Sequence, residues 1–236
     1  MSGHSKWAQI KRSKGAADVK KGALFSKLSK QITIAAKDGS SPDTNFKLRL
    51  AIQKARENAM PNDNIERAIK KASGTDASNM HTLQYEGYGP AGTAFIVEAA
   101  SDNPNRTFQN IRTIFAKNGG NIGQPGSVAW QFLTKGQILV ERAENLSEIE
   151  LSAIDAGADD VRESTEGLEI YTKPEDLEKI KNNITTVGAK IAQAEIIMES
   201  SQGVALNAEQ TTSVQKLFDA LSDDEDVVAV HTSGNL

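Results

Sequence analysis

The chain has 236 residues and a mass of 25.4 kDa, a length that allows roughly one to three small domains. Hydrophobic residues make up 38% and charged residues 25%, which is enough apolar material for a folded core and excludes wholesale disorder. The absence of cysteine excludes disulfides, thiolate nucleophiles and cysteine-based metal sites. No stretch is apolar enough to span a membrane and the N-terminal residues do not resemble a signal peptide, so we expect a soluble, cytoplasmic protein.

Charge is distributed unevenly along the chain. Residues 1–80 contain 16 Lys and Arg against 7 Asp and Glu, a net charge of +9, whereas the remaining residues contain 11 against 24, a net charge of −13. A basic module of this kind is typical of proteins that bind polyanions, and the acidic part keeps the whole molecule soluble. Charge alone leaves open the alternative that the basic helices only have solvated faces.

The first segment with helical periodicity covers residues 16–37. Its apolar side chains recur at i, i+3 and i+7, which predicts an amphipathic helix. Four lysines fall on the arc opposite these apolar residues: Lys20, Lys27, Lys30 and Lys37. This helix is therefore expected to direct a basic face away from the core.

Two further helices complete an N-terminal bundle, which we assign to residues 1–80. One is predicted over residues 45–59 and is ended by Pro61, and the next is predicted over residues 63–74. The basic side chains of this last helix face outward: Arg67, Lys70 and Lys71.

Beyond residue 80 short strands alternate with helices. Residues 93–100 are predicted to form a strand, and Val128, Trp130 and Phe132 alternate as one face of another strand that turns at residues 135–136. The order of elements indicates an α+β fold, in which the bundle is followed by two small ferredoxin-like α+β sandwich domains, one inserted in the other. The expected boundaries are residues 81–134 plus 200–236 for one domain and residues 135–199 for the inserted domain.

The sequence contains few signals for catalysis. Residues 87–92, G-Y-G-P-A-G, match the pattern G-x-G-x-x-G, but a proline lies inside it and a strand rather than a helix follows, so we interpret it as a turn into an edge strand. The acidic run at residues 223–226 lacks the spaced ligands of a calcium loop and is expected to be solvated. Neither His81 nor His231 has an acid–nucleophile pattern nearby. We therefore expect no enzymatic activity, no metal and no cofactor.

The N-terminal segment gives the strongest positive signal. It concentrates six cations within sixteen residues, beside one tryptophan and one histidine: Lys6, Lys11, Arg12, Lys14, Lys20 and Lys21, with Trp7 and His4. Cations that neutralise phosphates release counterions, and an indole can stack on an unpaired base. The alternative is a flexible basic tail whose tryptophan packs on the bundle. Arg106 and Arg112 are weaker candidates, because a solvated helix face explains them equally well.

Five long motifs stand out along the chain: G-H-S-K-W-A-Q-I-K, D-V-K-K-G-A-L-F-S-K-L, A-M-P-N-D-N-I-E-R-A-I-K-K, Y-E-G-Y-G-P-A-G and D-N-P-N-R-T. Together they resemble the YebC family, also called PmpR-type regulators. The similarity runs over nearly the whole chain and is strongest in residues 3–75 and 85–136. The sequence departs from the family pattern at Phe46, where Pro is frequent, at Ala59, where Asn is usual, and at Ala91, where Gly is frequent.

The resemblance implies a three-domain regulator of gene expression without catalytic activity. Bacterial members of the family are described as DNA-binding transcriptional regulators, the similar mitochondrial protein activates translation of cytochrome oxidase subunit I, and some bacterial relatives resemble ribosome-associated factors. The basic and aromatic positions of the family motif match His4, Lys6, Trp7, Lys11, Lys14, Lys27 and Lys30. With Arg12 and Lys20 added from the basic segments, these are the residues predicted to contact nucleic acid.

We therefore expect a nucleic-acid-binding regulator of transcription, with a translation factor that binds the ribosome or ribosomal RNA as the alternative. No helix-turn-helix reader is evident, which favours contacts to the backbone or to structured RNA. An enzyme with a site between the acidic domains and a binder of anionic membranes are the rival classes; the membrane is not expected as a partner, since the apolar face of helix 16–37 is better used in the bundle core. The oligomeric state is left open, and a monomer is compatible with the sequence. Replacing Lys27 and Lys30 by Glu is expected to weaken nucleic-acid binding and to leave thermal unfolding nearly unchanged.

Overall fold

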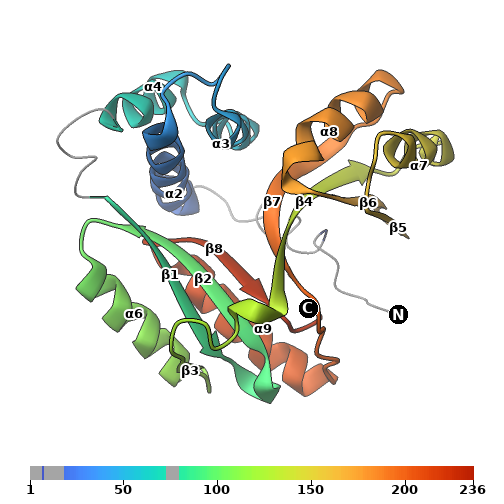
Figure 1. Ribbon diagram of the computed structural model, residues 1–236. Helices are drawn as coiled ribbons and strands as arrows, with labels where there is room; N and C mark the ends of the chain where they lie inside the picture. Colours follow the sequence, from blue (N-terminus) through green and yellow to red (C-terminus); the bar gives the residue numbers. More distant parts are fainter. Residues whose placement is uncertain (1–6, 8–18, 73–79) are drawn as a thin grey trace. The chain divides into compact units, whose positions relative to one another are not determined.

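The computed structural model describes Trp7, residues 19–72 and residues 80–236 (Figure 1). Two compact units are present: unit 1 combines Met1–Gln131 with Ser200–Leu236, and unit 2 is Phe132–Glu199. The described residues contain seven α-helices and two four-stranded sheets, which confirms the α+β class. None of these helices has the length and hydropathy that a bilayer span requires.

A helical bundle begins unit 1. It consists of α2 (Val19–Ala35), α3 (Phe46–Glu57) and α4 (Asn62–Lys71), and the apolar stripe of each helix lies in a common core that includes Leu28, Ile32 and Leu48. Asn45 caps α3, because its side chain accepts a hydrogen bond from the Leu48 N–H at 3.0 Å. The helical periodicity of this region is thus confirmed.

The first sheet completes unit 1. Its strands are β1 (His81–Tyr88), β2 (Ala94–Ser101), β3 (Asn121–Ile122) and β8 (Val227–Thr232), in the order β3-β1-β2-β8 with antiparallel neighbours. Helices α6 (Pro104–Lys117) and α9 (Ala208–Asp223) pack on one face of this sheet, in a core that includes Phe95, Val97, Phe115, Leu217 and Leu221. The sheet therefore joins a middle segment of the chain to a strand more than a hundred residues further on.

The glycine-rich motif forms a turn, as predicted, but the strand after it is not an edge strand. A short 3₁₀ helix at Pro90–Gly92 connects β1 to β2, and the Gly89 N–H donates to the Thr93 carbonyl at 2.7 Å. Strand β2 lies between β1 and β8, so it is central in the sheet. The expectation of an edge strand was wrong because β8, which comes from the other end of the chain, covers the second side of β2.

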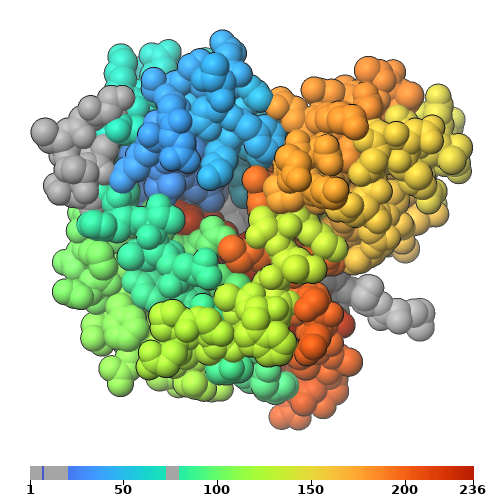
Figure 2. Space-filling model, in the orientation of Figure 1, coloured from blue at the N-terminus to red at the C-terminus, as the bar shows by residue number. Residues whose placement is uncertain are grey.

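Helix α2 contacts β2 and β8 of this first sheet, and the two views show the bundle beside the sheet domain (Figures 1 and 2). The side-chain amide of Gln31 donates to the Val228 carbonyl at 2.9 Å. The bundle and the first sheet consequently form one compact unit.

Unit 2 contains the second sheet. Its strands are β4 (Phe132–Glu141), β5 (Asp160–Ser164), β6 (Gly167–Thr172) and β7 (Ile191–Ser200), in the order β5-β6-β4-β7. Helices α7 (Leu146–Asp155) and α8 (Leu177–Thr186) contact β6 and β4. The core of this unit is formed by alternate strand residues and one stripe of each helix: Ile138, Val140, Leu168, Ile170, Ile149, Ile180 and Ile184.

The predicted strand at residues 128–132 is wrong. Residues Ala129–Gln131 form a 3₁₀ helix, Trp130 is 66% exposed, and β4 runs without a turn through residues 135–136. The physical reason is the buried carboxylate of Glu86, which accepts hydrogen bonds from three backbone N–H groups between residues 126 and 129. Backbone groups bound in this way are not available for a strand ladder.

Candidate nucleic-acid interface

The predicted contact residues are only partly covered by the structure. Five of the nine lie outside the described residues: His4, Lys6, Lys11, Arg12 and Lys14. For Lys20 the structure describes its place in α2 alone. Trp7, Lys27 and Lys30 are described with their side chains: Trp7 is buried, and the two lysines are partly buried and bound to other groups of the protein.

Trp7 is buried, with 6% of its surface exposed. Its indole Nε1 is also buried, and no hydrogen-bond acceptor for it is found among the described residues. An indole in this position is not accessible to an unpaired base, so stacking on nucleic acid requires Trp7 to leave its buried position.

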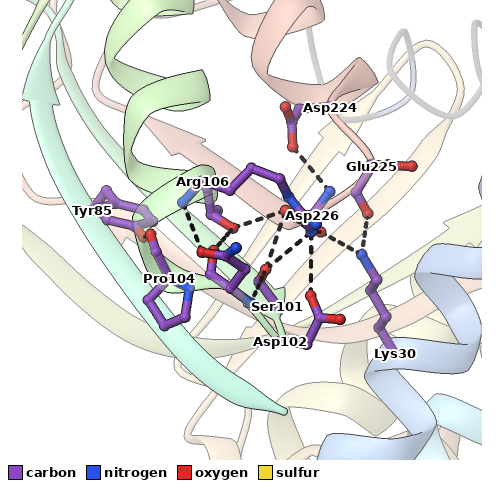
Figure 3. A network of polar contacts seen from close by, with 11 residues as sticks. Lys30, Tyr85, Ser101, Asp102, Pro104, Arg106, Asp224, Glu225 and Asp226 are labelled. Carbon is purple, nitrogen blue, oxygen red and sulfur yellow. Dashed lines mark hydrogen bonds and ion pairs between the residues drawn. The ribbon is translucent and has the colours of Figure 1, made fainter. Parts of the chain in front are cut away.

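Lys27 extends from α2 to the last turn of α9, and Lys30 extends to the loop between α9 and β8. The Lys30 ammonium lies 2.7 Å from an Asp226 carboxylate oxygen and donates to the Glu225 carbonyl at 2.8 Å (Figure 3). The Lys27 ammonium donates to the Ser222 carbonyl. Both ammonium groups are therefore bound by oxygens of the protein itself, and their assignment to nucleic acid stays a prediction.

Asp226 is the centre of a buried polar network (Figure 3). Its side chain is 1% exposed, and besides Lys30 it accepts hydrogen bonds from Thr107 Oγ1 at 2.8 Å, Arg106 Nη2 at 3.1 Å and Ser101 Oγ at 3.2 Å. Burial by itself raises the pKa of Asp226, but the hydrogen bonds from Lys30, Thr107 and Arg106 outweigh it and hold the pKa at about 2. The expectation that this acidic run is solvated was wrong for Asp226.

Two cations near Asp226, Lys27 and Arg106, have shifted pKa values. Burial lowers the pKa of Lys27, although the neighbouring carboxylates of Asp224 and Asp223 oppose that change. Arg106, a weaker candidate for nucleic acid, donates to Asp226, and the pKa of Arg106 is raised chiefly by that hydrogen bond. Lys27 and Lys30 thus link the bundle to residues next to the first sheet, whereas Arg106 binds Asp226 within the sheet domain and is half-exposed.

The cations of helix α4 differ from Lys27 and Lys30 in being exposed. Arg67, Lys70 and Lys71 are exposed, and among the described residues none of them is paired with a carboxylate. The Arg67 guanidinium donates to the Asp63 carbonyl at 3.2 Å and to the side-chain oxygen of Asn64, both uncharged acceptors. The helical spacing predicted that these three residues face outward, but nothing in the motif selected them as a site. We call Arg67, Lys70 and Lys71 the α4 basic face.

No group of three His, Asp or Glu residues that could hold a metal ion occurs among the described residues. Asp226 itself is surrounded by cationic and hydroxyl donors, which is the environment of a structural carboxylate and not of a cation ligand.

Comparison with known proteins places this architecture in a family. The model of the TACO1/YebC protein N-terminal domain matches residues 5–75, and the model of the TACO1/YebC second and third domain matches residues 80–234. A basic helical bundle joined to α+β sheets is thus the framework of a TACO1/YebC protein. The chain belongs to the TACO1/YebC family.

Individual relatives are similar over their whole length. A "Probable transcriptional regulatory protein" of Clostridium tetani is 45% identical over 98% of this chain and 96% of its own. A protein of the same description from Dehalococcoides mccartyi is 48% identical over 100% of this chain and 95% of its own. A crystal structure of a conserved hypothetical protein from Aquifex aeolicus is 40% identical and superimposes with a TM-score of 0.87, covering 98% of this chain and 96% of that chain.

Proposed function

We propose that the chain is a non-enzymatic, DNA-binding regulator of transcription that acts in the cytoplasm. The observation that carries this proposal is its full-length similarity to relatives described as probable transcriptional regulatory proteins. The net charge of +9 in residues 1–80 supplies the physical basis, since cations that replace counterions on phosphates drive binding to nucleic acid. The ribosome-binding alternative has no support in the descriptions of these relatives.

The contacts are proposed to be made mainly with the sugar–phosphate backbone. Within the described residues, the α4 basic face supplies exposed positive charge that no carboxylate neutralises. The basic N-terminal segment around Lys6 and Lys11 is proposed to supply further cations to the nucleic acid. Backbone contacts fix register and orientation on a duplex, while a sequence preference needs base contacts or DNA shape in addition.

The domain arrangement belongs to the same proposal. We divide the chain into a bundle at residues 1–80, a domain of residues 81–134 plus 200–236, and an inserted domain of residues 135–199, the last two of ferredoxin-like type. Two observations support this division: the family models separate residues 5–75 from residues 80–234, and the contacts within the chain separate Phe132–Glu199 as a unit. The acidic domains are proposed to arrange the approach of the bundle or to contact a protein partner.

The proposal is tested by crosslinking in living cells, followed by sequencing of the DNA and the RNA that copurify with the protein. Enrichment of a limited set of promoter sequences is the expected result. Enrichment of ribosomal RNA at a few positions, with no enrichment of DNA, would contradict it and establish a translation factor instead.

A further inference from the structure

A cavity of about 360 Å³ lies between α2 and α4 in the helical bundle. Small-molecule sites typically have volumes of about 300–1,000 Å³, so this cavity has room for a group the size of one nucleotide. Its wall on α2 includes Gly22, Ser26 and Ser29, and its wall on α4 includes Asn64, Arg67 and Lys71. The described residues that line it include no Asp or Glu.

The α2 wall of the cavity includes three small residues. Gly22, Ser26 and Ser29 recur at i, i+4 and i+7, which places them on one side of the helix. A Cβ atom at Gly22 would meet nothing within 4 Å, so no packing contact in the described chain requires a glycine there. Glycine weakens a helix relative to alanine, and what it provides here is open space beside two hydroxyl groups.

The α4 wall of the cavity has one amide and two cationic side chains, which favour an anion. Asn64, Arg67 and Lys71 recur at i, i+3 and i+7 and so share one side of α4. The contacts of Arg67 with uncharged oxygens on its own helix hold the guanidinium at the cavity wall, and no carboxylate of the described residues pairs with it. Lys30 also lines the cavity, but Asp226 neutralises it at 2.7 Å.

The two walls are held at a fixed separation. The buried hydroxyl of Thr33 on α2 donates to the Ala68 carbonyl on α4 at 3.0 Å. Leu28, Ile32 and Ile65 pack in the core beneath. The donors of the cavity are therefore positioned before a ligand arrives, which lowers the entropic cost of binding.

We propose that this cavity binds one sugar–phosphate unit of a nucleic acid strand. Arg67 and Lys71 contact the phosphate oxygens, and Ser26, Ser29 and Asn64 hydrogen-bond to phosphate or sugar. A guanidinium matches two phosphate oxygens at once, and a lysine adds a point charge. The partly buried ring of Phe25 supplies an apolar floor for the sugar. This inference rests on the proposed function and names the part of the bundle that carries it out.

The test measures binding of the full chain to a fluorescein-labelled 30-base-pair duplex of mixed sequence, by anisotropy over a series of salt concentrations. Each cation that contacts a phosphate contributes about 0.9 to the slope of log K against log salt. Arg67→Ala with Lys71→Ala is expected to make the slope less negative by about 2 and to raise Kd at least tenfold at 0.1 M salt.

Two controls separate a cavity from a diffuse positive surface. Lys47→Ala with Arg56→Ala removes the same charge from α3, which contributes no residue to the cavity wall, and is expected to change the slope by less than 1. Ser26→Phe keeps the charge but fills the cavity, and because Ser26 is exposed its folding is expected to be unchanged while Kd rises at least fivefold. Equal losses from the α3 and α4 pairs, or unchanged binding by Ser26→Phe with normal thermal unfolding, would overturn the proposal.

The outcome also separates this inference from the proposed function. If the wild-type chain binds the duplex and the cavity variants bind equally well, only the cavity assignment is lost. If the wild-type chain binds neither the duplex nor a 30-nucleotide RNA, both fail. Binding of AMP that depends on Arg67 and Lys71, without any effect of these residues on the duplex, would show a site for free nucleotides and overturn the proposal of a strand.

Discussion

Two alanines hold the backbone in the left-handed region. Ala59 has φ 57° and Ala91 has φ 58°, and both are positions where the sequence departs from the family pattern described above. Ala59 follows the C-terminus of α3, where the Met60 N–H donates to the Ala55 carbonyl at 3.0 Å and the Ala59 N–H to the Arg56 carbonyl at 2.9 Å. This hydrogen-bond pattern ends many helices and normally places Gly or Asn at the left-handed residue. The chain keeps the conformation without the residue that favours it.

Glycine is therefore expected to stabilise both positions. Because a Cβ atom in the left-handed region costs about 1–2 kcal/mol, Ala59→Gly and Ala91→Gly should each raise the free energy of unfolding by about 0.5–1 kcal/mol. Urea denaturation followed by tryptophan fluorescence reports on unit 1, which contains both tryptophans, Trp7 and Trp130.

The matched control is Ala23→Gly on the exposed side of α2, where glycine should instead cost about 1 kcal/mol. A loss of stability at Ala59 and Ala91 equal to that at Ala23 would contradict the strain argument.

The buried carboxylate of Asp226 makes stability depend on pH. Its pKa of about 2 in the folded chain lies below its ordinary value of 3.8, so the ionised form favours folding. This contribution, about 1–2 kcal/mol after allowance for solvent screening, is complete above pH 4 and is lost as the pH falls towards 2. Asp226→Asn should lower stability at pH 7 and remove this part of the acid dependence in urea unfolding. Asp102→Asn, which changes an exposed partner of Arg106, should leave the pH dependence as in the wild type.

At the scale of elements, Glu86 determines the path from β3 to β4. Its carboxylate accepts from the N–H groups of Gly126 at 2.7 Å and of Val128 and Ala129 at 2.8 Å. Burial raises the pKa of Glu86, and these three backbone donors lower it by more, so the net shift is downward. One side chain on β1 thus replaces the hydrogen bonds that a strand ladder would have given this loop.

Glu86→Gln should release the loop. The amide has one acceptor oxygen in place of two, and its NH₂ group faces backbone donors, so we expect a loss of about 2 kcal/mol. Hydrogen exchange of the amides at residues 126–129 should accelerate while that of β2 changes little. Glu66→Gln, on the exposed surface of α4, serves as the control and should leave all of these rates unchanged. Unaltered protection of Val128 in Glu86→Gln would show that the loop is held by other contacts.

Elements that depend on residues close in sequence were predicted correctly, and elements that depend on distant residues were not. Helices α2, α3 and α4 were predicted because each carries its apolar stripe within its own residues. Strand β1 was not predicted, since it is half exposed and alternates poorly, and the segment around Trp130 was predicted wrongly because its partner, Glu86, is distant in the chain.

The same limit applies to the candidate site. Helical spacing correctly put Lys27 and Lys30 on the arc opposite the apolar residues of α2. It could not show that Asp226 and the Ser222 carbonyl, almost two hundred residues away in the chain, meet them there. By contrast, the outward direction of Arg67 and Lys71 was predictable, because α4 alone determines it.

For the whole molecule, these lysines decide how firmly the bundle is attached to the first sheet. The structure reverses the expectation that Lys27→Glu with Lys30→Glu leaves thermal unfolding unchanged. A glutamate at position 30 would face the buried carboxylate of Asp226, so we expect a cost of about 2–4 kcal/mol and a fall in Tm of roughly 5–10 °C. Differential scanning calorimetry measures this.

The charge-matched control is Lys47→Glu with Arg56→Glu, both exposed on α3, which should change Tm by less than about 2 °C. Equal Tm values for the two double variants would show that the contacts of α2 with the α9–β8 loop do not stabilise the unit.

The position of β8 in the first sheet has a consequence for biosynthesis. Strand β2 is made early, but its neighbour β8 leaves the ribosome only after the whole of unit 2, whose own strands are contiguous in sequence and can pair at once. Until then β2 is an open edge that can pair with other chains, and Lys30 has no Asp226 to bind. A nascent chain that has exposed unit 2 but not yet β8 is therefore the form most exposed to aggregation, and the contact of Lys30 with Asp226 forms only after that later segment has left the ribosome.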